Sequence, residues 1–314
     1  MKVCVRTTSG PQIGMGHLRR CLTLAGELAR HAEVELYVAG DPRGPQVARD
    51  AGFTAHDDAA FDASHGDLVV VDDYALDSAQ LAAIAARTPT AVIDDLADRE
   101  LDVDAVINGN ADALELHYRT APRTELLLGT RFTLLRPSFR GLPVRHARPV
   151  VQRILVTLGG ADVLDQTPAI ALGLSRALPA VRIDVVIGPF FRPYEPAGAR
   201  VVVHHAPPEL APLMVEADLA ITAGGQTTYE LAACGVPSVA LCTAENQRGN
   251  LRALERAGTL VQAADATAAV EAACVLASDL ARRARMTATA QALVDGLGAE
   301  RVATALVALH GRLA

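Results

Sequence analysis

The stretch that decides the fold is residues 217–241, which read ADLAITAGGQTTYELAACGVPSVAL. A short apolar run leads into a Gly-Gly turn, a segment of helical composition follows, Gly235 ends it, and a second apolar run begins. Strand, glycine-rich turn, helix and strand form the repeating unit of parallel sheets that are covered by helices. The sequence therefore predicts an α/β fold.

The same alternation extends through the rest of the chain. Strand-like runs are expected at 3–6, 34–38, 68–71, 91–93, 105–107, 153–158 and 181–187. Between Arg136 and Pro149 the composition shifts to Pro, Arg, His and Gly, which is typical of a linker. We expect two doubly wound Rossmann-like domains facing a cleft, over 1–145 and 150–298, with an amphipathic helix over 299–314 packing back on the first.

Composition narrows the classes of ligand. The 314 residues carry a formal charge of -7 with both signs interspersed, so the basic face that a nucleic-acid partner requires is not expected. Lys2 is the only lysine, so a phosphate must be held by arginine, by backbone N–H groups or by helix N-termini. A small-molecule substrate is therefore favoured, and the oligomeric state stays open.

Cysteine spacing and apolar runs bear on three further kinds of protein: disulfide-bonded, zinc-binding and membrane proteins. The five cysteines form no CxxC pair, so neither a disulfide framework nor a zinc site is indicated, and no cofactor is expected. No apolar run approaches the ~20 residues that span a bilayer. The strand-like start at Lys2 does not resemble a signal peptide, so we expect a cytoplasmic protein without an integral membrane segment.

The loop between the first strand and the first helix is the first candidate site. It reads RTTSGPQIGMGH over 6–17. Gly14 and Gly16 allow close approach of a ligand to the backbone, and a helix N-terminus attracts anions. The helix dipole and Arg19 or Arg20 favour a neutral ring at His17, which makes it the candidate general base. The alternative is a helix start and a turn without chemistry, and GxGH alone is a weak motif.

Polar residues end three further strands and are expected to meet in one crevice. Asp72, Tyr74 and Asn108 are kept as substrate-binding candidates. We expect Asp73 and Asp95 to cap the helices that follow, which is the commoner role of an acid at such a position. Paired acids at strand ends also suit Mg²⁺, which leaves metal-dependent hydrolysis as an alternative.

The Gly-Gly turn is the strongest site signal. Its N–H groups can cradle a diphosphate, and Glu230, about one turn into the helix, can accept hydrogen bonds from a ribose diol. A purely structural corner would not require Gly-Gly followed by Gln and two threonines. The expected nucleotide contacts are Ala223, Gly224, Gly225, Thr227, Thr228, Glu230, Asn246 and Gln247. Gly159, Gly160 and Asp162 end the first strand of the second half, where substrate binding and a tight turn with an Asx cap are equally expected.

At these residues the sequence resembles the UDP-diacetamido-trideoxy-altropyranose hydrolases of pseudaminic acid biosynthesis and their spore-coat polysaccharide relatives. The resemblance covers nearly the whole chain. It rests on Arg6, the Gln12 to Leu22 segment with Gly14, Gly16, His17 and Arg20, the acids at 72–73 and 94–95 with Tyr74, Asn108, Gly159 to Asp162, and Gly224 to Leu231. The C-terminal pattern is also similar to the lipid-linked N-acetylglucosaminyltransferase of peptidoglycan synthesis, another member of the glycosyltransferase-B group.

The resemblance implies a glycosyltransferase-B fold that binds its nucleotide in the C-terminal domain. It implies metal-independent attack of water at the anomeric carbon, with His17 as general base and UDP as leaving group. It departs from some hydrolases at Tyr229, where they carry Asn, and the GGQTT loop is more typical of a transferase. A glycosyltransferase acting on the same donor is the first alternative, and a nucleotide-sugar binding module without turnover is the second.

Overall fold

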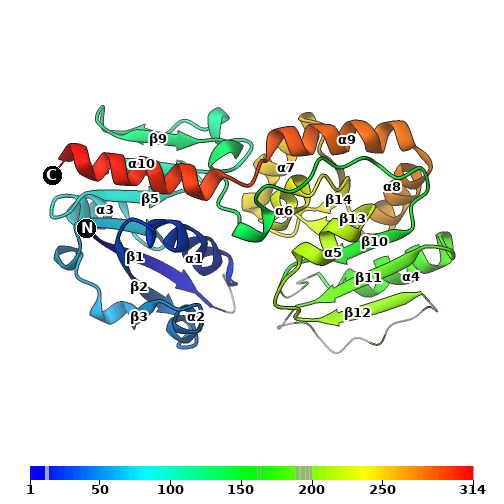
Figure 1. Cartoon of the computed structure of the whole chain (residues 1–314), viewed down its shortest axis with the longest axis horizontal. Helices are drawn as coiled ribbons and strands as arrows, with labels where there is room; N and C mark the ends of the chain where they lie inside the picture. Colours follow the sequence, from blue (N-terminus) through cyan, green and yellow to red (C-terminus); the bar gives the residue numbers. More distant parts are fainter. Residues whose placement is uncertain are drawn as a thin grey trace. The chain divides into compact units, whose positions relative to one another are not determined.

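The structure is a computed structural model that describes residues 1–10, 14–160, 162, 164–188, 191, 195, 198 and 200–313. The chain folds into two compact units: unit 1 is Met1–Pro137 with Gly296–Ala314, and unit 2 is Ser138–Asp295. Each unit is built on a parallel sheet with helices on its faces (Figure 1). The predicted α/β class with two Rossmann-like domains is confirmed.

The sheet of unit 1 has seven strands in the order β3-β2-β1-β4-β5-β7-β9 among the described residues. The strands are β1 (Lys2–Ser9), β2 (Glu33–Gly40), β3 (Thr54–Asp57), β4 (Leu68–Asp72), β5 (Thr90–Ile93), β7 (Ala105–Asn108) and β9 (Glu125–Leu128). A small separate pair is formed by β6 (Glu100–Leu101) and β8 (Arg119–Thr120). The strand order reverses between β1 and β4, and ligands of open parallel sheets bind at the carboxyl ends of such a pair.

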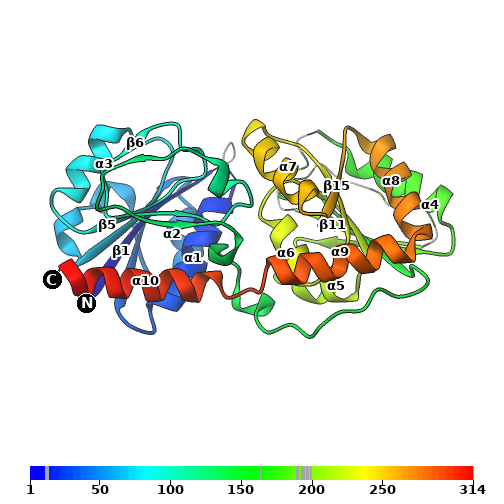
Figure 2. The ribbon, with the colours of Figure 1, turned by 90° about the horizontal axis from the view of Figure 1, so that it is seen from above.

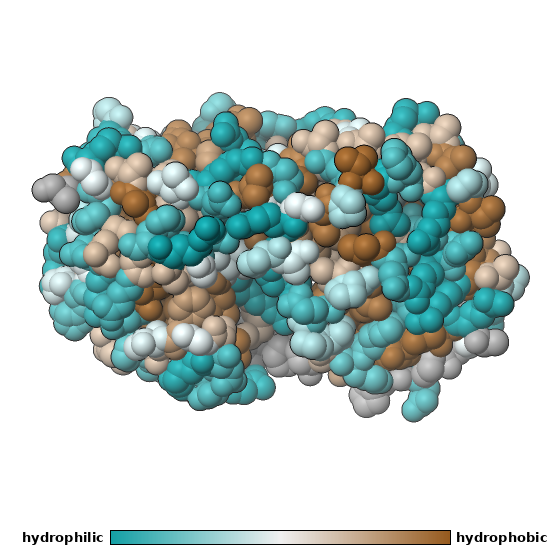
Figure 3. Space-filling view, in the orientation of Figure 1, coloured by the Kyte–Doolittle hydropathy of each residue, from teal (hydrophilic) through white to brown (hydrophobic). Residues whose placement is uncertain are grey.

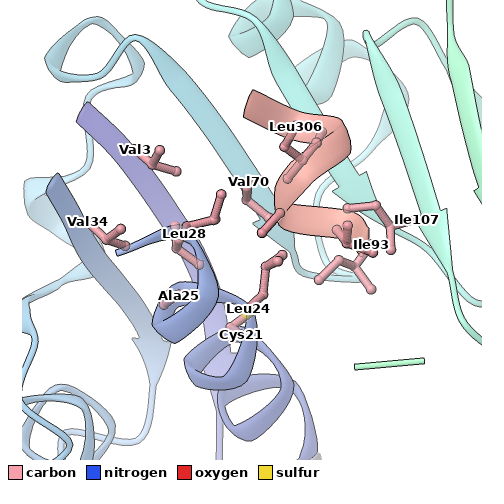
Figure 4. Close-up of a cluster of buried hydrophobic side chains, with 14 of the residues drawn as sticks. Val3, Cys21, Leu24, Ala25, Leu28, Val34, Val70, Ile93, Ile107 and Leu306 are labelled. Carbon is pink, nitrogen blue, oxygen red and sulfur yellow. The ribbon is translucent and has the colours of Figure 1, made fainter. Parts of the chain in front are cut away.

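Helices cover both faces of this sheet. They are α1 (Gly16–Leu28), α2 (Gly44–Asp50), α3 (Ser78–Ala85) and α10 (Gly298–Leu313). Alternate residues of β1 face opposite sides, so Val3 and Val5 pack toward α1 while Cys4 packs on the α3 side. Figure 4 shows Leu24 of α1 and Leu306 of α10 in the core beside the sheet. Full burial of each leucine contributes about 1.5–3 kcal/mol.

Unit 2 repeats this plan. Its strands are β10 (Arg153–Thr157), β11 (Arg182–Ile187), β12 (Val201–His205), β13 (Leu219–Ala223), β14 (Ser238–Leu241) and β15 (Leu260–Ala263). Their order is β12-β11-β10-β13-β14-β15, so the reversal lies between β10 and β13. The two glycine pairs of the sequence, at 159–160 and 224–225, follow these two strands. The glycine-rich turns of unit 2 therefore lie at its switch point.

The helices of unit 2 lie on both sides of its sheet (Figure 2). They are α4 (Thr167–Ala177), α5 (Ala211–Glu216), α6 (Thr227–Ala233), α7 (Arg248–Arg256), α8 (Ala266–Ser278) and α9 (Leu280–Leu293). Ile170 of α4 and Ala269 of α8 are fully buried in the same core as Ile154 and Ile221 of the central strands. Packing of these helices on the sheet therefore holds in place the edge at which the glycine-rich turns at 159–160 and 224–225 begin.

The surface mixes polar and apolar residues. In Figure 3 hydrophilic and hydrophobic side chains are interspersed over the face that it shows. Large exposed apolar side chains include Val144 and Val150. Within the described residues, no helix combines the length and the apolar character that crossing a bilayer requires.

Candidate active site

Two elements bring the candidate base beside an acid in unit 1. Asp72 is the last residue of β4 and is fully buried. Helix α1 begins at Gly16, so His17 and Arg20 lie three residues apart and share one face of its first turns. Because α1 follows β1 and β1 pairs with β4, this face meets the end of β4.

His17 and Asp72 form a hydrogen-bonded pair. The Nδ1 atom of His17 lies 2.6 Å from Oδ1 of Asp72. An ionised carboxylate only accepts, so Nδ1 carries the hydrogen and Nε2 is the nitrogen that can take up a proton. Burial on its own would raise the pKa of Asp72, but the charge and hydrogen bonds of Arg20, with those of His17, outweigh it and hold the pKa below the usual range.

Arg20 joins two carboxylates. Its Nε and Nη2 donate to Oδ2 and Oδ1 of Asp72 at 2.6 and 2.7 Å. Its Nη1 donates to Oδ2 of Asp95 at 2.6 Å. Bidentate pairing of this kind fixes orientation as well as charge. Arg20 therefore holds the carboxylate that orients His17.

Tyr74 contacts the same histidine from another side. Its ring meets the imidazole of His17 edge to face, with 4.6 Å between centroids and 86° between planes. Its hydroxyl donates to Oδ2 of Asp95. Burial first, and then the charge of Asp95, raise the pKa of Tyr74 far above its ordinary value, so the phenol stays protonated. Tyr74 thus packs against the base and is itself anchored.

The prediction that Asp95 caps the next helix is wrong. Its neighbour Asp94 takes the local role, because Oδ1 of Asp94 accepts the N–H groups of Leu96 and Ala97 at 3.1 and 2.8 Å. Asp95 turns to the site instead and accepts from Arg20, Tyr74 and, at 3.0 Å, Nδ2 of Asn110. The sequence pattern assigned Asp95 a capping role and did not single out Asn110.

Arg6 is held apart from this cluster by other acids. Its Nε and Nη2 bind Asp58 at 2.6 and 2.8 Å, and its Nη1 binds Asp73 at 3.0 Å. Asp73 also accepts the N–H of Ala75, so it closes a turn, whereas the helix cap expected of it belongs to Asp77. The structure thus places Arg6 in a network that ties the end of β4 to the segment after β3.

Asn108 lies at the end of β7 with both polar ends used inside unit 1. Its Nδ2 donates to the hydroxyl of Tyr118 at 2.9 Å, and its Oδ1 accepts the N–H of Asn110 at 2.9 Å. The side chain is fully buried. Its contact with the site runs through Asn110, which donates to Asp95.

The glycine loop before α1 is described in part. Gly14 has a positive φ of 71°, and its backbone exchanges two hydrogen bonds with Gly10 that close the loop. A Cβ placed on Gly14 or on Gly16 would meet nothing within 4 Å, so space is open beside both. Gln12, predicted to bind substrate, lies outside the described residues.

A cavity adjoins the site through Tyr74. Its volume is about 220 Å³. It is lined by Tyr74, Ala75, Leu76, Asp77, Leu96, Asp98 and Arg99. These residues belong to the loops that follow β4 and β5, so the cavity opens on the sheet edge that carries the base.

In unit 2 the turn after β13 combines a crowded and an open glycine. A Cβ on Gly224 would lie 2.6 Å from Cδ1 of Leu251, whereas one on Gly225 would meet nothing within 4 Å. Ala223 ends β13 and Thr227 begins α6. Thr228 donates its hydroxyl to the carbonyl of Gly225 at 2.8 Å. The turn is therefore shaped by packing on one side and left accessible on the other.

The remaining nucleotide candidates lie around this turn in sequence and differ in burial. Glu230 lies in the first turn of α6 and is only 7% exposed. Gln247 accepts the N–H of Thr243 at 2.9 Å, and Asn246 is exposed. The Tyr229 hydroxyl donates to Asn250, which links α6 to α7.

The turn after β10 has a local role at Asp162. Its carboxylate accepts the N–H groups of Gln166 and Thr167 at 3.1 and 2.7 Å, and so caps α4. Gly159 is exposed and has a positive φ of 86°. Gly160 lies against Gly188 so closely that a Cβ on Gly188 would come 2.3 Å from its carbonyl oxygen. Asp162 thus makes the hydrogen bonds of the expected Asx cap, and its role in substrate binding stays a prediction.

No family model matches the chain. An uncharacterised protein of Methanocaldococcus jannaschii is 24% identical over 79% of this chain and 57% of its own length. The spore coat polysaccharide biosynthesis protein SpsG of Bacillus subtilis is 26% identical over 66% of this chain and 65% of its own length. The chain thus spans less than two thirds of these relatives.

Solved structures define the fold. The glycosyltransferase SnogD from Streptomyces nogalater superposes with a TM-score of 0.69 at 20% identity, over 98% of this chain and 99% of its own. UDP-GlcNAc 2-epimerase from Neisseria meningitidis does so with 0.62 at 14% identity, over 98% and 100%. The two Rossmann-like units therefore have the glycosyltransferase-B fold. Within that fold, unit 1 carries a histidine oriented by a buried carboxylate.

Proposed function

We propose that this protein is an enzyme that transfers the sugar of a nucleotide-activated donor to an acceptor hydroxyl, with His17 as general base. The pair of His17 and Asp72 is the observation that carries the proposal, because a carboxylate at Nδ1 leaves Nε2 to take a proton. The nucleotide is assigned to the turn at Gly224 and Gly225 in unit 2, with Thr227, Thr228 and Glu230. Helix N-termini and open glycine N–H groups suit a diphosphate.

The chemistry follows from this arrangement. The acceptor O–H gives its proton to Nε2 of His17, and the oxygen attacks the anomeric carbon opposite the nucleotide. The bond from that carbon to the diphosphate oxygen breaks with its electrons going to the diphosphate, so configuration inverts. Asp72, kept ionised by Arg20, stabilises the imidazolium that forms.

Three observations support a transferase. The superposed SnogD is a glycosyltransferase. The relative SpsG is a spore coat polysaccharide biosynthesis protein. The cavity of about 220 Å³ that shares Tyr74 with the site offers room for an acceptor larger than water.

Hydrolysis is the second candidate, with water in place of the acceptor. The loop that ends at Gly14, Gly16 and His17 favours it, because this loop resembles that of the hydrolases of pseudaminic acid biosynthesis. The same base and the same leaving group serve both reactions. By this resemblance, the donor would be a UDP-activated diacetamido-trideoxyhexose.

Product analysis tests the proposal. The protein is incubated with UDP-, GDP- and CMP-sugars, including the UDP-activated diacetamido-trideoxyhexose, with EDTA present and with or without a panel of hydroxyl acceptors. Nucleotide release that requires an acceptor, with a glycoside as product, supports transfer. Release of free sugar without an acceptor supports hydrolysis instead. Tight binding of a donor without release under every condition refutes both and favours a binding protein.

A further inference from the structure

Asp95 holds the two side chains that flank the candidate base. One of its oxygens, Oδ2, accepts both from Nη1 of Arg20 at 2.6 Å and from the hydroxyl of Tyr74. The other accepts from Nδ2 of Asn110 at 3.0 Å. The side chain is 13% exposed, so these contacts are largely shielded from water. Among the contacts of the described residues, Asp95 makes no hydrogen bond with His17 and reaches it only through Arg20 and Tyr74.

The contacts of Asp95 restrict how Arg20 can lie. The guanidinium has two nitrogens on Asp72 and the third on Asp95, so a single plane must satisfy both acids. Nη2 of Arg20 lies 3.3 Å from Nδ1 of His17, and both donate to the same oxygen of Asp72. Loss of the Asp95 anchor would let the guanidinium turn and compete with the histidine for that oxygen.

The charges around His17 also indicate a role for Asp95. The groups that face or back the imidazole are Asp72 from β4, Arg20 from α1, Tyr74 after β4 and Asp95 after β5. With Tyr74 protonated, one arginine and two carboxylates give the cluster a net negative charge. Uptake of a proton by His17 brings that charge to zero. The charge of Asp95 therefore favours the imidazolium that a general base becomes.

Tyr74 carries a second effect of Asp95. Its ring lies edge to face against the imidazole of His17, and the hydroxyl at the far end of the ring is tied to Asp95. A ring fixed at both ends limits rotation of the imidazole about its side chain. The hydrogen bond to Asp72 and the ring of Tyr74 together fix where Nε2 points.

We infer that Asp95 is a positioning residue for His17, which acts through Arg20 and Tyr74 to set the direction and the proton affinity of Nε2. The effect of Asp95 on catalysis rests on the proposed function, in which Nε2 of His17 takes the proton of the acceptor. The arrangement of the histidine does not rest on that function, and the test separates the two.

The test combines nuclear magnetic resonance with kinetics on the full chain. ¹⁵N-histidine-labelled protein without substrate is titrated as wild type, Asp95→Asn, Asp95→Glu and Asp102→Asn, and His17 is assigned from a His17→Gln sample. Asp102 is a half-exposed aspartate of unit 1 that pairs with Arg123 and serves as the matched control. Tyr74→Phe, which removes only the hydroxyl, is the second variant should Asp95→Asn fail to fold.

We expect Asp95→Asn to change the pH dependence of the His17 ¹⁵N resonances and to reduce the share of the Nδ1–H form. The expected loss in kcat is about 10- to 100-fold with KM unchanged. Asp95→Glu, which keeps the charge, should restore the titration, and Asp102→Asn should match wild type. Tyr74→Phe should lower kcat in the same direction.

Unaltered His17 resonances in Asp95→Asn, with a loss of thermal stability alone, would overturn the inference and leave Asp95 a structural residue. So would an equal change in Asp102→Asn. A shifted His17 titration in a protein that releases no nucleotide from any sugar would support the positioning role and refute the proposed function.

Discussion

The Nδ1 atom of His17 lies 2.6 Å from the carboxylate of Asp72, which is fully buried and is held in turn by Arg20. The histidine comes from the first turn of a helix, and the acid comes from the end of the strand that pairs with β1. Because Asp72 is buried and bound by Arg20, its carboxylate stays against Nδ1 and fixes the tautomer of His17. This relationship is the basis of the proposed chemistry.

Replacing Asp72 with Asn should disable the base without unfolding unit 1. The amide keeps the shape of the side chain but loses the charge that stabilises the imidazolium, and Arg20 retains its contact with Asp95. We expect kcat for nucleotide release to fall about 10³-fold with KM little changed. Steady-state kinetics and a thermal melt check this, with Asp102→Asn as control, and a kcat within a few-fold of wild type would contradict it.

Replacing Gly224 or Gly225 with Ala separates packing from binding. The added methyl at Gly224 would lie 2.6 Å from Cδ1 of Leu251 and 3.0 Å from Oε1 of Gln247, so we expect a loss of stability of about 1–3 kcal/mol. The site beside Gly225 is open, so Gly225→Ala should change stability by less than about 0.5 kcal/mol. Urea unfolding measures both.

The same pair tests the nucleotide assignment. Because a diphosphate on this turn would approach the open side of Gly225, Gly225→Ala should weaken nucleotide binding while the fold stays intact. Calorimetric titration with UDP and with other nucleoside diphosphates measures the affinity. An affinity equal to wild type for the nucleotide that binds would place the diphosphate elsewhere.

Asp184 should make the stability of unit 2 depend on pH. Burial would raise its pKa, but the hydrogen bonds from Arg182 and His204 outweigh burial and lower it. A lowered folded-state pKa means that the stabilisation is present above the unfolded value of about 3.9 and is lost as the pH falls through the folded one. We expect Asp184→Asn to cost about 1–3 kcal/mol near neutral pH.

The measurement is urea unfolding of wild type and Asp184→Asn from neutral to acidic pH. The difference between the two proteins should shrink as the pH falls below about 4, where the carboxylate of the unfolded chain takes up protons, and should be lost once the pH is below the lowered pKa of the folded protein. A difference that stays constant down to the acid end would mean that packing, and not charge, accounts for the effect of Asp184.

Arg283 should be important for stability and irrelevant to chemistry. Its side chain is 1% exposed and donates to the carbonyls of Leu276, Ala277, Arg148 and Pro149. Arg283→Met leaves these carbonyls without their donor, which should cost about 3–5 kcal/mol. The exposed Arg285→Met is the matched control and should cost less than about 0.5 kcal/mol. Urea unfolding measures both, and equal losses would contradict the assignment.

Much of the architecture could be predicted because it depends on local pattern. The strand predicted at 153–158 forms as β10 (Arg153–Thr157), and the helix expected over 299–314 forms as α10 (Gly298–Leu313). Strands end where polar residues begin, and parallel strands share one carboxyl edge, so Asp72 and Tyr74 were expected near His17. The contacts at 2.6 Å and 4.6 Å agree with that expectation.

The roles within each acidic pair could not be predicted. Asp94 and Asp95 are neighbours in one loop, and which of them binds the local N–H groups depends on the path of that loop, where Ala97 has a φ of 52°. Arg6 was expected at the site, but its partner Asp58 lies 52 residues away. Such choices depend on tertiary contacts that a local pattern does not contain. For Asn110, the one signal in the sequence is its position two residues after Asn108, just beyond the strand that Asn108 ends.

The predicted linker also depends on contacts that the local sequence does not contain. Residues 136–149 have the composition of a connecting segment, yet Ser138 and the residues after it belong to unit 2. Arg145 donates to the carbonyls of Val215 and Ala217, and its own N–H donates to Gln291. Partners this distant in sequence cannot be inferred from composition.

The most direct test of the central claim is nucleotide release in a single turnover by wild type, His17→Ala and His31→Ala, with donor affinity measured alongside. His31 is an exposed histidine just beyond the same helix and serves as the control. The account predicts equal rates for wild type and His31→Ala, and a loss of about 10²–10⁴-fold for His17→Ala at unchanged donor affinity. Turnover by His17→Ala at the wild-type rate would show that His17 is not the base.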